Sequence, residues 1–522
     1  MGEVLRIGVD VGGTNTDAVL LRGREVLALH KSPTTADVGS GIVSAIDEVL
    51  RRGGVAPGAI AVVMIGTTHF TNAFVEARHL CRVGVLRLGA PATLAIRPLV
   101  DWPRLLKDAV YGHGVVGAGG FNYDGRPITP LDPAEIRRVA REFRERGIEA
   151  VAISSVFAPV NAGQEEEAAR LVQEELPGVR VAVSSQIGRI GLIERENAAV
   201  MNAALLPMAE RVVESFRRAL GDLGVRAPFY VSQNDGTLLD PDTVARYPVL
   251  TFASGPTNSM RGAAFLSGLR DALVMDIGGT TTDVGALVNG FPRESAVAVD
   301  IGGVRTNFRM PDLLSIGLGG GSLVVVEDGR VRVGPRSVGY RITSEALVFG
   351  GTQLTATDVA VAAGYADIGD RDRVAGLDRR LVAAAVDEIH RLAEDALDRM
   401  KTNATDVPLV LVGGGSVLID RDLKGASRVE IPASAGVANA IGAAIAQVSG
   451  AVDRVYSYDA RGRDATLAEA RDEAVRNAVA AGAAPASVGV TEVEELPLAY
   501  LPGGAVRVRV KAVGDLVLGS AA

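Results

Sequence analysis

The sequence predicts an α/β protein that contains two related domains, and three observations support this. The stretch DVGGTNTD at residues 10–17 returns almost unchanged as DIGGTTTD at residues 276–283. Apolar runs that suit buried strands alternate with stretches of helical periodicity, an order typical of α/β domains. The chain has 522 residues, 48% of them hydrophobic and 62 of them glycine, enough for more than one packed core joined by tight turns.

Each copy of the repeated stretch is predicted to form a hairpin. LRIGV precedes Asp10 and ALVM precedes Asp276, so a buried strand leads into each glycine turn. A second apolar run, AVLL or VGAL, follows each copy. This strand, turn, strand order argues against Rossmann and P-loop motifs, because their glycines open a helix.

The residue types in the two hairpins are those that bind phosphate. Paired glycines let backbone N–H groups approach a polyphosphate, and threonine hydroxyls add donors. Two copies therefore predict two domains that close on the same phosphates from opposite sides. The predicted phosphate ligands are Gly12, Gly13, Thr14, Asn15, Thr16, Gly278, Gly279, Thr280, Thr281 and Thr282.

Four aspartates frame these turns. Asp10 and Asp276 stand at strand ends, where a carboxylate can hold Mg²⁺ through water beside two or three phosphates. Asp17 and Asp283 close the hairpins. They either orient substrate or water, or cap turn amides.

The first third of the chain continues with a helix and a strand. GSGIVSAIDEVLRRGG has apolar residues at helical spacing, and AIAVVMIG is a strand that ends in the polar stretch TTHFTNAF. Ligands bind near strand ends in α/β sheets, so His69 either faces substrate or a metal, or is a hydrogen-bonded turn histidine.

Residues 91–130 have an irregular pattern and are predicted as an inserted loop near the cleft or, preferably, a connecting β-ribbon. The helix DPAEIRRVAREFRERG follows, with Asp132 as its N-cap and Pro133 at its first position. A strand, a helix and a further strand complete a βαβ order within an N-terminal domain of residues 1–195.

The second domain is predicted over residues 196–450. It opens with a long crossover helix that Pro207 breaks or kinks. Its later strand LVLVGGGSVL ends in Gly413, Gly414, Gly415 and Ser416. AGVANAIGAAIAQV then predicts a helix of small residues that packs closely on a neighbouring helix or a ligand loop. Residues 451–522 are predicted to form a small C-terminal α+β appendage.

The net charge and the cysteine content argue against several classes of partner and of chemistry. A formal net charge of −8 argues against nucleic acid or an acidic membrane as the main partner. Cys81 is the single cysteine, so a disulfide framework and a CxxC redox pair are excluded, and Cys81 is expected to be a buried apolar residue. No signal-type segment or apolar run of about 18 residues occurs, so a cytoplasmic location is expected.

Taken in order, these motifs resemble the superfamily of actin, sugar kinases and heat-shock chaperones. That resemblance implies two ribonuclease-H-like domains around one nucleotide cleft. It also implies that Gly413 to Ser416 approach adenosine and that GVANAIGAAI is the second hinge helix.

Within this superfamily the chain most closely resembles the hydantoinase A and oxoprolinase family. The matching stretches are DVGGTNTDAVLL, GTTHFTNAFVE, DGRPITPLD, GIEAVAISSVFAPVN, NDGTLL, FASGPTNSMRGA, DIGGTTTDVGAL, IGLGGGSL and TATDVAVAAG. The resemblance implies ATP and Mg²⁺, a cyclic amide substrate such as a hydantoin, oxoproline or another lactam, and in some members carboxylation of a ketone. It also implies a B-type partner subunit, and an oligomer is expected.

The chain departs from the family pattern at two places. Gln164 stands where members often carry histidine, and RSVGYRITSEALVFGG replaces a glycine-rich segment that contains cysteine. Both departures concern substrate or partner contacts. Two alternative functions also remain at this stage, a small-molecule kinase of the same superfamily and a nucleotide-driven activator or chaperone-like ATPase.

Overall fold

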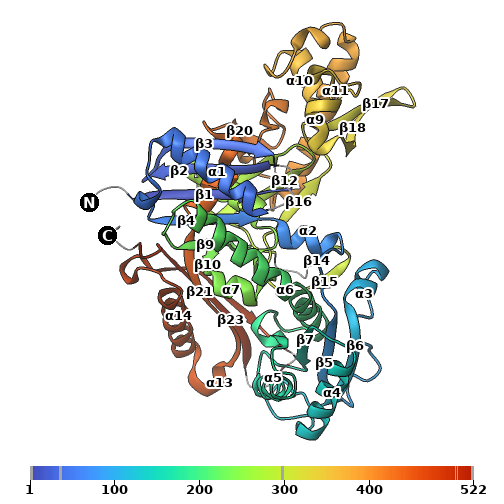
Figure 1. Cartoon of the computed structure of the whole chain (residues 1–522), viewed down its shortest axis with the longest axis vertical. Helices are drawn as coiled ribbons and strands as arrows, with labels where there is room; N and C mark the ends of the chain where they lie inside the picture. Colours follow the sequence, from blue (N-terminus) through green and yellow to red (C-terminus); the bar gives the residue numbers. More distant parts are fainter. Residues whose placement is uncertain are drawn as a thin grey trace.

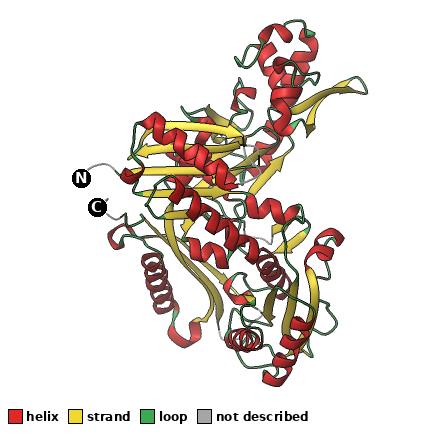
Figure 2. Ribbon diagram, in the orientation of Figure 1, coloured by secondary structure: helices red, strands yellow, loops and turns green. Residues whose placement is uncertain are grey.

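The computed structural model describes residues 4–13, 15–33, 38–295, 299–499, 501 and 504–518. Figure 1 shows the N-terminal strands in the body of the molecule, a lobe with α10 (Ala356–Ala363) and α11 (Arg379–Met400) above, and a smaller α/β domain below. Helices and strands are layered throughout these parts (Figure 2). None of the described helices is long and apolar enough to cross a membrane.

The first sheet begins with the predicted hairpin. Strands β1 (Leu5–Val11) and β2 (Asn15–Arg22) are antiparallel, and β3 (Glu25–Pro33) continues the meander. On the other side of β1, β4 (Val62–Thr67) and β9 (Phe229–Ser232) run parallel to it. The spatial order β3-β2-β1-β4-β9 is the ribonuclease-H-like arrangement.

The two faces of this sheet are covered by helices from distant parts of the chain. Ile7 and Leu20 pack in one core with α1 (Val38–Gly53), the helix predicted here. Val19, one residue from Leu20, packs on the opposite face against α12 (Ala438–Ala444). This alternation follows from the two-residue period of a strand, and it buries the sheet on both sides.

The long helix predicted to cross between the halves of the chain is α6 (Leu192–Asp222). Pro207 lies inside it without ending it, so the predicted break does not occur. Most of its side chains between Arg195 and Leu220 are buried, because the helix packs on α1 and on the strands of the small domain. Tertiary packing therefore stabilises this helix despite the hydrogen bond that proline removes.

The second sheet repeats the strand order of the first. β11 and β12 form the second predicted hairpin, β19 and β20 extend the sheet in parallel beyond β11, and β13 and β16 pair with β12. The order β13-β12-β11-β19-β20 confirms the predicted pair of ribonuclease-H-like domains. The bounds are β11 (Ala272–Ile277), β12 (Thr282–Val288), β13 (Phe291–Pro292), β16 (Leu313–Ile316), β19 (Val407–Val412) and β20 (Ala426–Glu430).

Helices α8 (Ser254–Ser267) and α12 cross at very short range. A Cβ atom on Gly442 would overlap the backbone oxygen of Asn258, and one on Gly262 would overlap that of Ala438. Glycine is required at both positions, since the two backbones are in contact. The prediction of a closely packed small-residue helix is confirmed.

Residues 83–183 form a smaller parallel sheet with the order β6-β5-β7-β8. Residues 91–130 contain helix α3 and strand β6 of this unit as well as irregular segments. Asp132 caps α4 by accepting a hydrogen bond from the Ala134 N–H, as predicted. The bounds are β5 (Val83–Ala90), α3 (Arg104–Val110), β6 (Tyr111–Ala118), α4 (Pro133–Glu145), β7 (Ala150–Ser155), α5 (Gly163–Glu175) and β8 (Arg180–Val183).

The C-terminal residues have the predicted α+β content, and their strands extend the first sheet. β21 pairs with β10 and β23, and β22 forms the edge. The domain limits near residues 195 and 450 stay predictions. The bounds are β10 (Thr237–Leu239), β21 (Gln447–Ser457), α13 (Tyr458–Arg461), α14 (Arg463–Ala480), β22 (Gly489–Pro497) and β23 (Ala505–Gly514).

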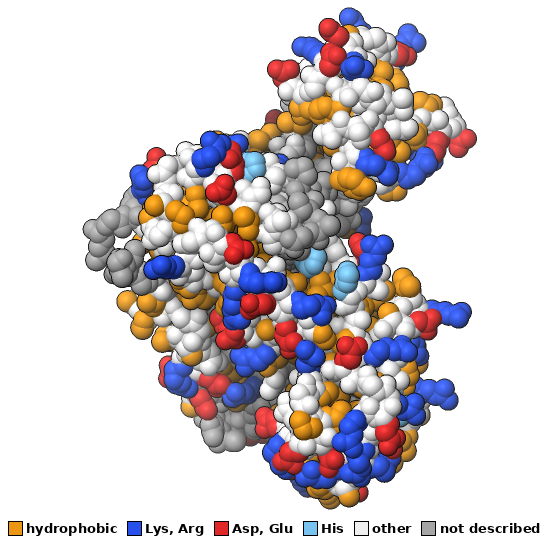
Figure 3. All heavy atoms as spheres, in the orientation of Figure 1, with side chains coloured by type: hydrophobic (Ala, Val, Ile, Leu, Met, Phe, Trp, Pro, Cys, Tyr) orange, Lys and Arg blue, Asp and Glu red, His pale blue; other side chains and the backbone are white. Residues whose placement is uncertain are grey.

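The remaining elements are short or belong to the upper lobe. In the space-filling view the molecule is hollowed between this lobe and the body, and acidic and basic side chains are interspersed over the small domain (Figure 3). The bounds are α2 (His69–Val75), α7 (Pro241–Arg246), β14 (Val299–Ile301), β15 (Val304–Thr306), β17 (Ser322–Glu327), β18 (Arg330–Ser337) and α9 (Ile342–Glu345).

Candidate phosphate-binding cleft

The turns of both hairpins open into one cleft of about 430 Å³. Its walls come from both sheets and from the ends of α8 and α12. The glycine turn after β19 and the upper lobe complete the lining. The predicted site residues that line it are Asp10, Gly12, Gly13, Asn15, Asp17, Asp276, Gly278, Gly279, Thr280, Thr281, Asp283, Gly413, Gly414 and Gly415.

The two hairpins have the same local geometry. The Gly12 N–H donates to the Asn15 carbonyl at 3.0 Å, and the Gly278 N–H donates to the Thr281 carbonyl at 2.9 Å. Asp10 lies opposite Asp17 in the first hairpin register, and Asp276 lies opposite Asp283 in the second. Each turn therefore presents a glycine pair between two aspartates that face the same cleft.

A second glycine supports each leading aspartate. Gly66 lies beside Asp10 on the parallel strand β4, and a Cβ atom there would overlap the Asp10 carboxylate. Gly413 follows the parallel strand β19, and a Cβ atom there would overlap the Asp276 carboxylate. Gly413 also has a φ of +84°, which favours glycine. In each domain the repeated unit therefore consists of the hairpin and the parallel strand next to it, β4 in the first sheet and β19 in the second.

Asp10 is a buried carboxylate of the cleft that two asparagine side chains hold. It is 3% exposed and accepts hydrogen bonds from the amide of Asn258 at 3.3 Å and that of Asn439 at 3.0 Å. Asn439 also donates to Asp17 at 2.8 Å, and Lys31 forms an ion pair with Asp17 at 2.9 Å. Burial, followed by repulsion from Asp17, raises the pKa of Asp10 to about 6.

In the second hairpin, fewer hydrogen bonds offset the burial of the two aspartates. Burial raises the pKa of Asp276, although Ser259 donates a hydrogen bond to its carboxylate. Burial also raises the pKa of Asp283 to about 6, against a hydrogen bond from Ser315 and with repulsion from Asp276. Burial is the largest cause of each of these raised pKa values and repulsion between the carboxylates adds to it, so a bound cation would favour the charged forms.

Other predicted residues lie outside the cleft lining. Thr16 and Thr282 are fully buried within β2 and β12, and the Thr282 hydroxyl donates to a backbone carbonyl at 2.7 Å. Ser416 starts a short 3-10 helix behind the glycine turn. His69 is the first residue of α2, and burial lowers its pKa. Thr14 lies outside the described residues.

Sequence reasoning did not predict Lys31, Asn258 and Asn439, whose side chains contact Asp10 or Asp17. Lys31 reaches the cleft from β3, where it pairs across the sheet with Asp17. Asn258 and Asn439 come from the two helices that cross at glycine contacts. The available signal was a single amide in each of two stretches otherwise rich in small residues, FASGPTNSM and GVANAIGAAI.

Two residues singled out in the sequence have structural roles. Cys81 is buried, and burial raises the pKa of its thiol to about 12, which confirms the expected buried apolar residue. Gln164 donates to the Thr129 carbonyl at 3.0 Å and accepts from the Gly120 N–H at 2.6 Å. Its amide thereby fixes the segment that follows β6.

The residues of the cleft fit a divalent cation bound together with phosphate. Among the described residues no three carboxylate, histidine or cysteine side chains form a ready-made metal cage. Mg²⁺ does not require one, because it keeps several waters and binds one or two carboxylates plus substrate phosphates. Asp10 and Asp276 would hold it, and the glycine turns leave room for the phosphate oxygens.

Comparisons with known proteins identify close relatives. Caprolactamase subunit alpha of Pseudomonas jessenii is 30% identical over 410 residues, covering 74% of this chain and 58% of that protein. Acetophenone carboxylase gamma subunit of Aromatoleum aromaticum is 28% identical over 404 residues, covering 69% and 53%. The chain therefore spans less than two thirds of the length of either relative.

A solved structure supports the fold over nearly the whole chain. The ATP-dependent caprolactamase from Pseudomonas jessenii superposes with a TM-score of 0.79 at 21% identity, covering 98% of this chain and 88% of that one. The hydantoinase/oxoprolinase N-terminal region matches residues 6–176, and the hydantoinase/oxoprolinase region matches residues 195–370. Together these regions make up more than half of the sequence, and the chain belongs to the hydantoinase/oxoprolinase family.

Proposed function

We propose that this chain binds Mg·ATP in the cleft between its two ribonuclease-H-like domains and uses it to open a cyclic amide. The observation that carries the proposal is the pair of matching hairpins whose glycine turns and aspartates face one cleft. Membership of the hydantoinase/oxoprolinase family and the similarity to caprolactamase subunit alpha support the substrate class.

The proposed chemistry removes the resonance that protects an amide. The barrier to rotation about an amide bond, about 18–20 kcal/mol, indicates the strength of that resonance. Transfer of the γ-phosphoryl group of ATP to the amide oxygen breaks the bond between the γ-phosphorus and ADP and forms a carbon–oxygen–phosphorus link. Water then attacks the activated carbon, and the ring nitrogen leaves as an amine that takes up a proton, which opens the ring and leaves an acyl phosphate. A second water attacks the same carbon and releases inorganic phosphate, which keeps the former amide oxygen, and the open-chain carboxylate.

The residues of the cleft have distinct proposed roles. Asp10 and Asp276 hold Mg²⁺ through water, and the bound ion neutralises charge on the phosphates. Backbone N–H groups of the glycine turns and the exposed hydroxyls of Thr280 and Thr281 donate to phosphate oxygens. Asp17, fixed by Lys31 and Asn439, and Asp283 are placed to orient water or the amide.

A second subunit is part of the proposal. The relatives are named as the alpha subunit of caprolactamase and the gamma subunit of acetophenone carboxylase, which supports a multi-subunit enzyme. We propose a B-type partner for this chain. A screen of ATP hydrolysis over hydantoins, oxoproline, larger lactams and ketones with bicarbonate, with and without a candidate partner, would identify the substrate.

Mg·ATP is expected to stabilise the fold, because only a closed cleft lets both hairpins contact the phosphates. Binding to the native state at 100 times Kd would add about 2.7 kcal/mol to the free energy of unfolding. Thermal melts with Mg·ATP, Mg·ADP and magnesium alone measure this effect. A melting temperature that saturating nucleotide leaves unchanged would count against the nucleotide site.

Oxygen labelling tests the chemistry itself. If the amide oxygen is phosphorylated, hydrolysis of substrate labelled with heavy oxygen at the carbonyl should move about one labelled atom into phosphate per ring opened. A kinase would leave its phosphate on the product, and a conformational ATPase would release unlabelled phosphate. Efficient ring opening with unlabelled phosphate would refute the phosphorylated intermediate while leaving the nucleotide site in place.

A further inference from the structure

A second cavity, of about 600 Å³, lies between the small α/β domain and the C-terminal strands. Residues 158–162 and 185–190, which follow the carboxyl ends of β7 and β8, form one wall. Parallel α/β sheets bind ligands outside the carboxyl ends of their strands. Of the residues that the structure describes, none lines both this cavity and the phosphate cleft.

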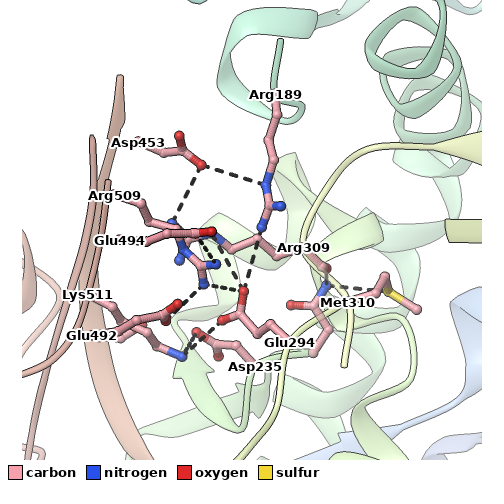
Figure 4. Close-up of polar contacts among 12 residues, drawn as sticks. Arg189, Asp235, Glu294, Arg309, Met310, Asp453, Glu492, Glu494, Arg509 and Lys511 are labelled. Carbon is pink, nitrogen blue, oxygen red and sulfur yellow. Dashed lines mark hydrogen bonds and ion pairs between the residues drawn. The ribbon is translucent and has the colours of Figure 1, made fainter. Parts of the chain in front are cut away.

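A network of charged side chains extends from the opposite wall, where Asp235, Asp453 and Arg507 line the cavity (Figure 4). Arg507 donates two hydrogen bonds to Asp453, at 2.7 and 2.6 Å. Lys511 pairs with Asp235 at 2.7 Å, and Arg509 donates to Glu294. Each of these three carboxylates already accepts a hydrogen bond from a cation, although Arg509 also pairs with Glu492 and Glu494, and the pKa values of all three are lowered.

Arg189 and Arg309 are the two cavity-lining cations left without such a partner in the described part of the chain. Their guanidinium nitrogens lie 3.6–3.7 Å and 3.9–4.0 Å, respectively, from the nearest oxygens of Glu294 and Asp453. These distances exceed those of hydrogen bonds. The two side chains are only 14% and 16% exposed. Two mostly buried guanidinium groups thus lie near carboxylates that other cations already bind, and neither has a hydrogen-bonded acceptor of its own among the described residues.

Hydrogen bonds with neighbouring side chains hold the backbone of both arginines in place. Asn307 accepts from the Arg189 N–H at 3.1 Å and donates to the Arg189 carbonyl at 3.1 Å, and Arg195 donates to the same carbonyl at 3.0 Å. Asn234 donates to the Arg309 carbonyl. In Figure 4 the Arg189 side chain extends from its loop toward Asp453 and Glu294. The backbone at both positions is therefore fixed before any ligand binds, so binding has only the two side chains left to order.

We propose that this cavity binds a small oxyanion, a carboxylate or a phosphate, between Arg189 and Arg309. The planar guanidinium fork matches both groups and donates two parallel hydrogen bonds. A negative charge here would supply the missing acceptors and offset the repulsion between the two arginines. The volume lies in the range of small-molecule sites, about 300–1,000 Å³, so the ligand is a small acid or phosphate ester.

The alternative is a purely structural network that fastens the C-terminal strands to the small domain. Isothermal titration of the full chain with malonate and with inorganic phosphate, at ionic strength matched with sodium chloride, separates the two possibilities. Malonamide serves as the neutral analogue of malonate. We expect one of the anions to bind, and malonamide to bind at least about tenfold more weakly than malonate if malonate is the one.

Variants test the assignment to these two residues. Arg189→Met and Arg309→Met should each weaken anion binding by about tenfold or more. Arg454→Met is the matched control, since Arg454 lines the same cavity but is 56% exposed and pairs with Glu473 at 2.7 Å. It should change the affinity by less than about threefold. Arg189→Lys keeps the charge without the fork, so it should lose most of the affinity even if the methionine variants fold poorly.

Three results would overturn the proposal. One is that neither anion binds the wild-type chain more tightly than chloride. A second is equal anion binding by wild type and the folded Arg189 and Arg309 variants. A third is loss of the Mg·ATP melting shift in those same variants, because the cavity would then belong to the nucleotide cleft. Binding of phosphate alone, with the same arginine dependence, would support the site and assign it to phosphate esters.

Discussion

Asp10→Asn is expected to lower ATP turnover by about a thousandfold while leaving the chain folded. The carboxylate sits at the bottom of the cleft, where Asn258 and Asn439 hold it, and an amide oxygen is a poor substitute for a carboxylate that binds Mg²⁺. Without nucleotide, the Asp10→Asn variant should be no less stable than the wild-type protein. Burial and the repulsion from Asp17 already disfavour the charged form of Asp10, so a neutral side chain removes an unfavourable interaction.

Two measurements on the same samples check this expectation. Phosphate release reports turnover, and the melting temperature of the protein without nucleotide should stay the same or rise by a few degrees. Asp276→Asn is expected to behave likewise, because Asp276 occupies the equivalent place in the second hairpin. Cys81→Ser is the control and should keep its turnover. Loss of turnover in a folded Cys81→Ser protein, with active aspartate variants, would refute the proposed site.

Gly442→Val is expected to lower the free energy of unfolding by about 3 kcal/mol and to abolish turnover. Any side chain at this position would overlap the backbone oxygen of Asn258, so α8 and α12 would have to separate. The same two helices supply Asn258 and Asn439, the amides that fix Asp10. Gly442→Val alters only the packing of α8 against α12, but it should therefore also displace the Asp10 carboxylate.

Urea denaturation and phosphate release measure the two effects of this substitution. Gly221→Ala in α6 is the matched control, because a Cβ atom there meets no atom within 4 Å. Alanine is favoured over glycine in a helix by roughly 1 kcal/mol, so this variant should be as stable as wild type or slightly more stable, with unchanged turnover. Normal stability and turnover of Gly442→Val would mean that the close helix crossing does not position the site.

The repeated hairpins were predictable because all the information lies in one short, continuous stretch of sequence for each copy. Strand periodicity, paired glycines and the flanking aspartates define each turn locally, and the structure has both predicted hairpins, with Asp10 opposite Asp17 and Asp276 opposite Asp283. The same is true of α1 and of the Asp132 cap, which depend on spacing and on one side-chain hydrogen bond. Local chemistry and the family resemblance together predicted half of the cleft lining.

The repeated hairpins, the fold class with two ribonuclease-H-like domains and the family were thus all predictable from the sequence. The tertiary structure alone decided which distant residues complete each site. Asn258 and Asn439 approach Asp10 from positions 248 and 429 residues away, and Arg189 meets the network of the C-terminal strands in the same way. The pairing of β21 with β10 joins the C-terminal strands to the first sheet. The packing of α8 against α12 brings Asn258 and Asn439 close to Asp10. Periodicity describes neighbours along the chain, whereas hydrogen bonds and charge interactions depend on distance in space.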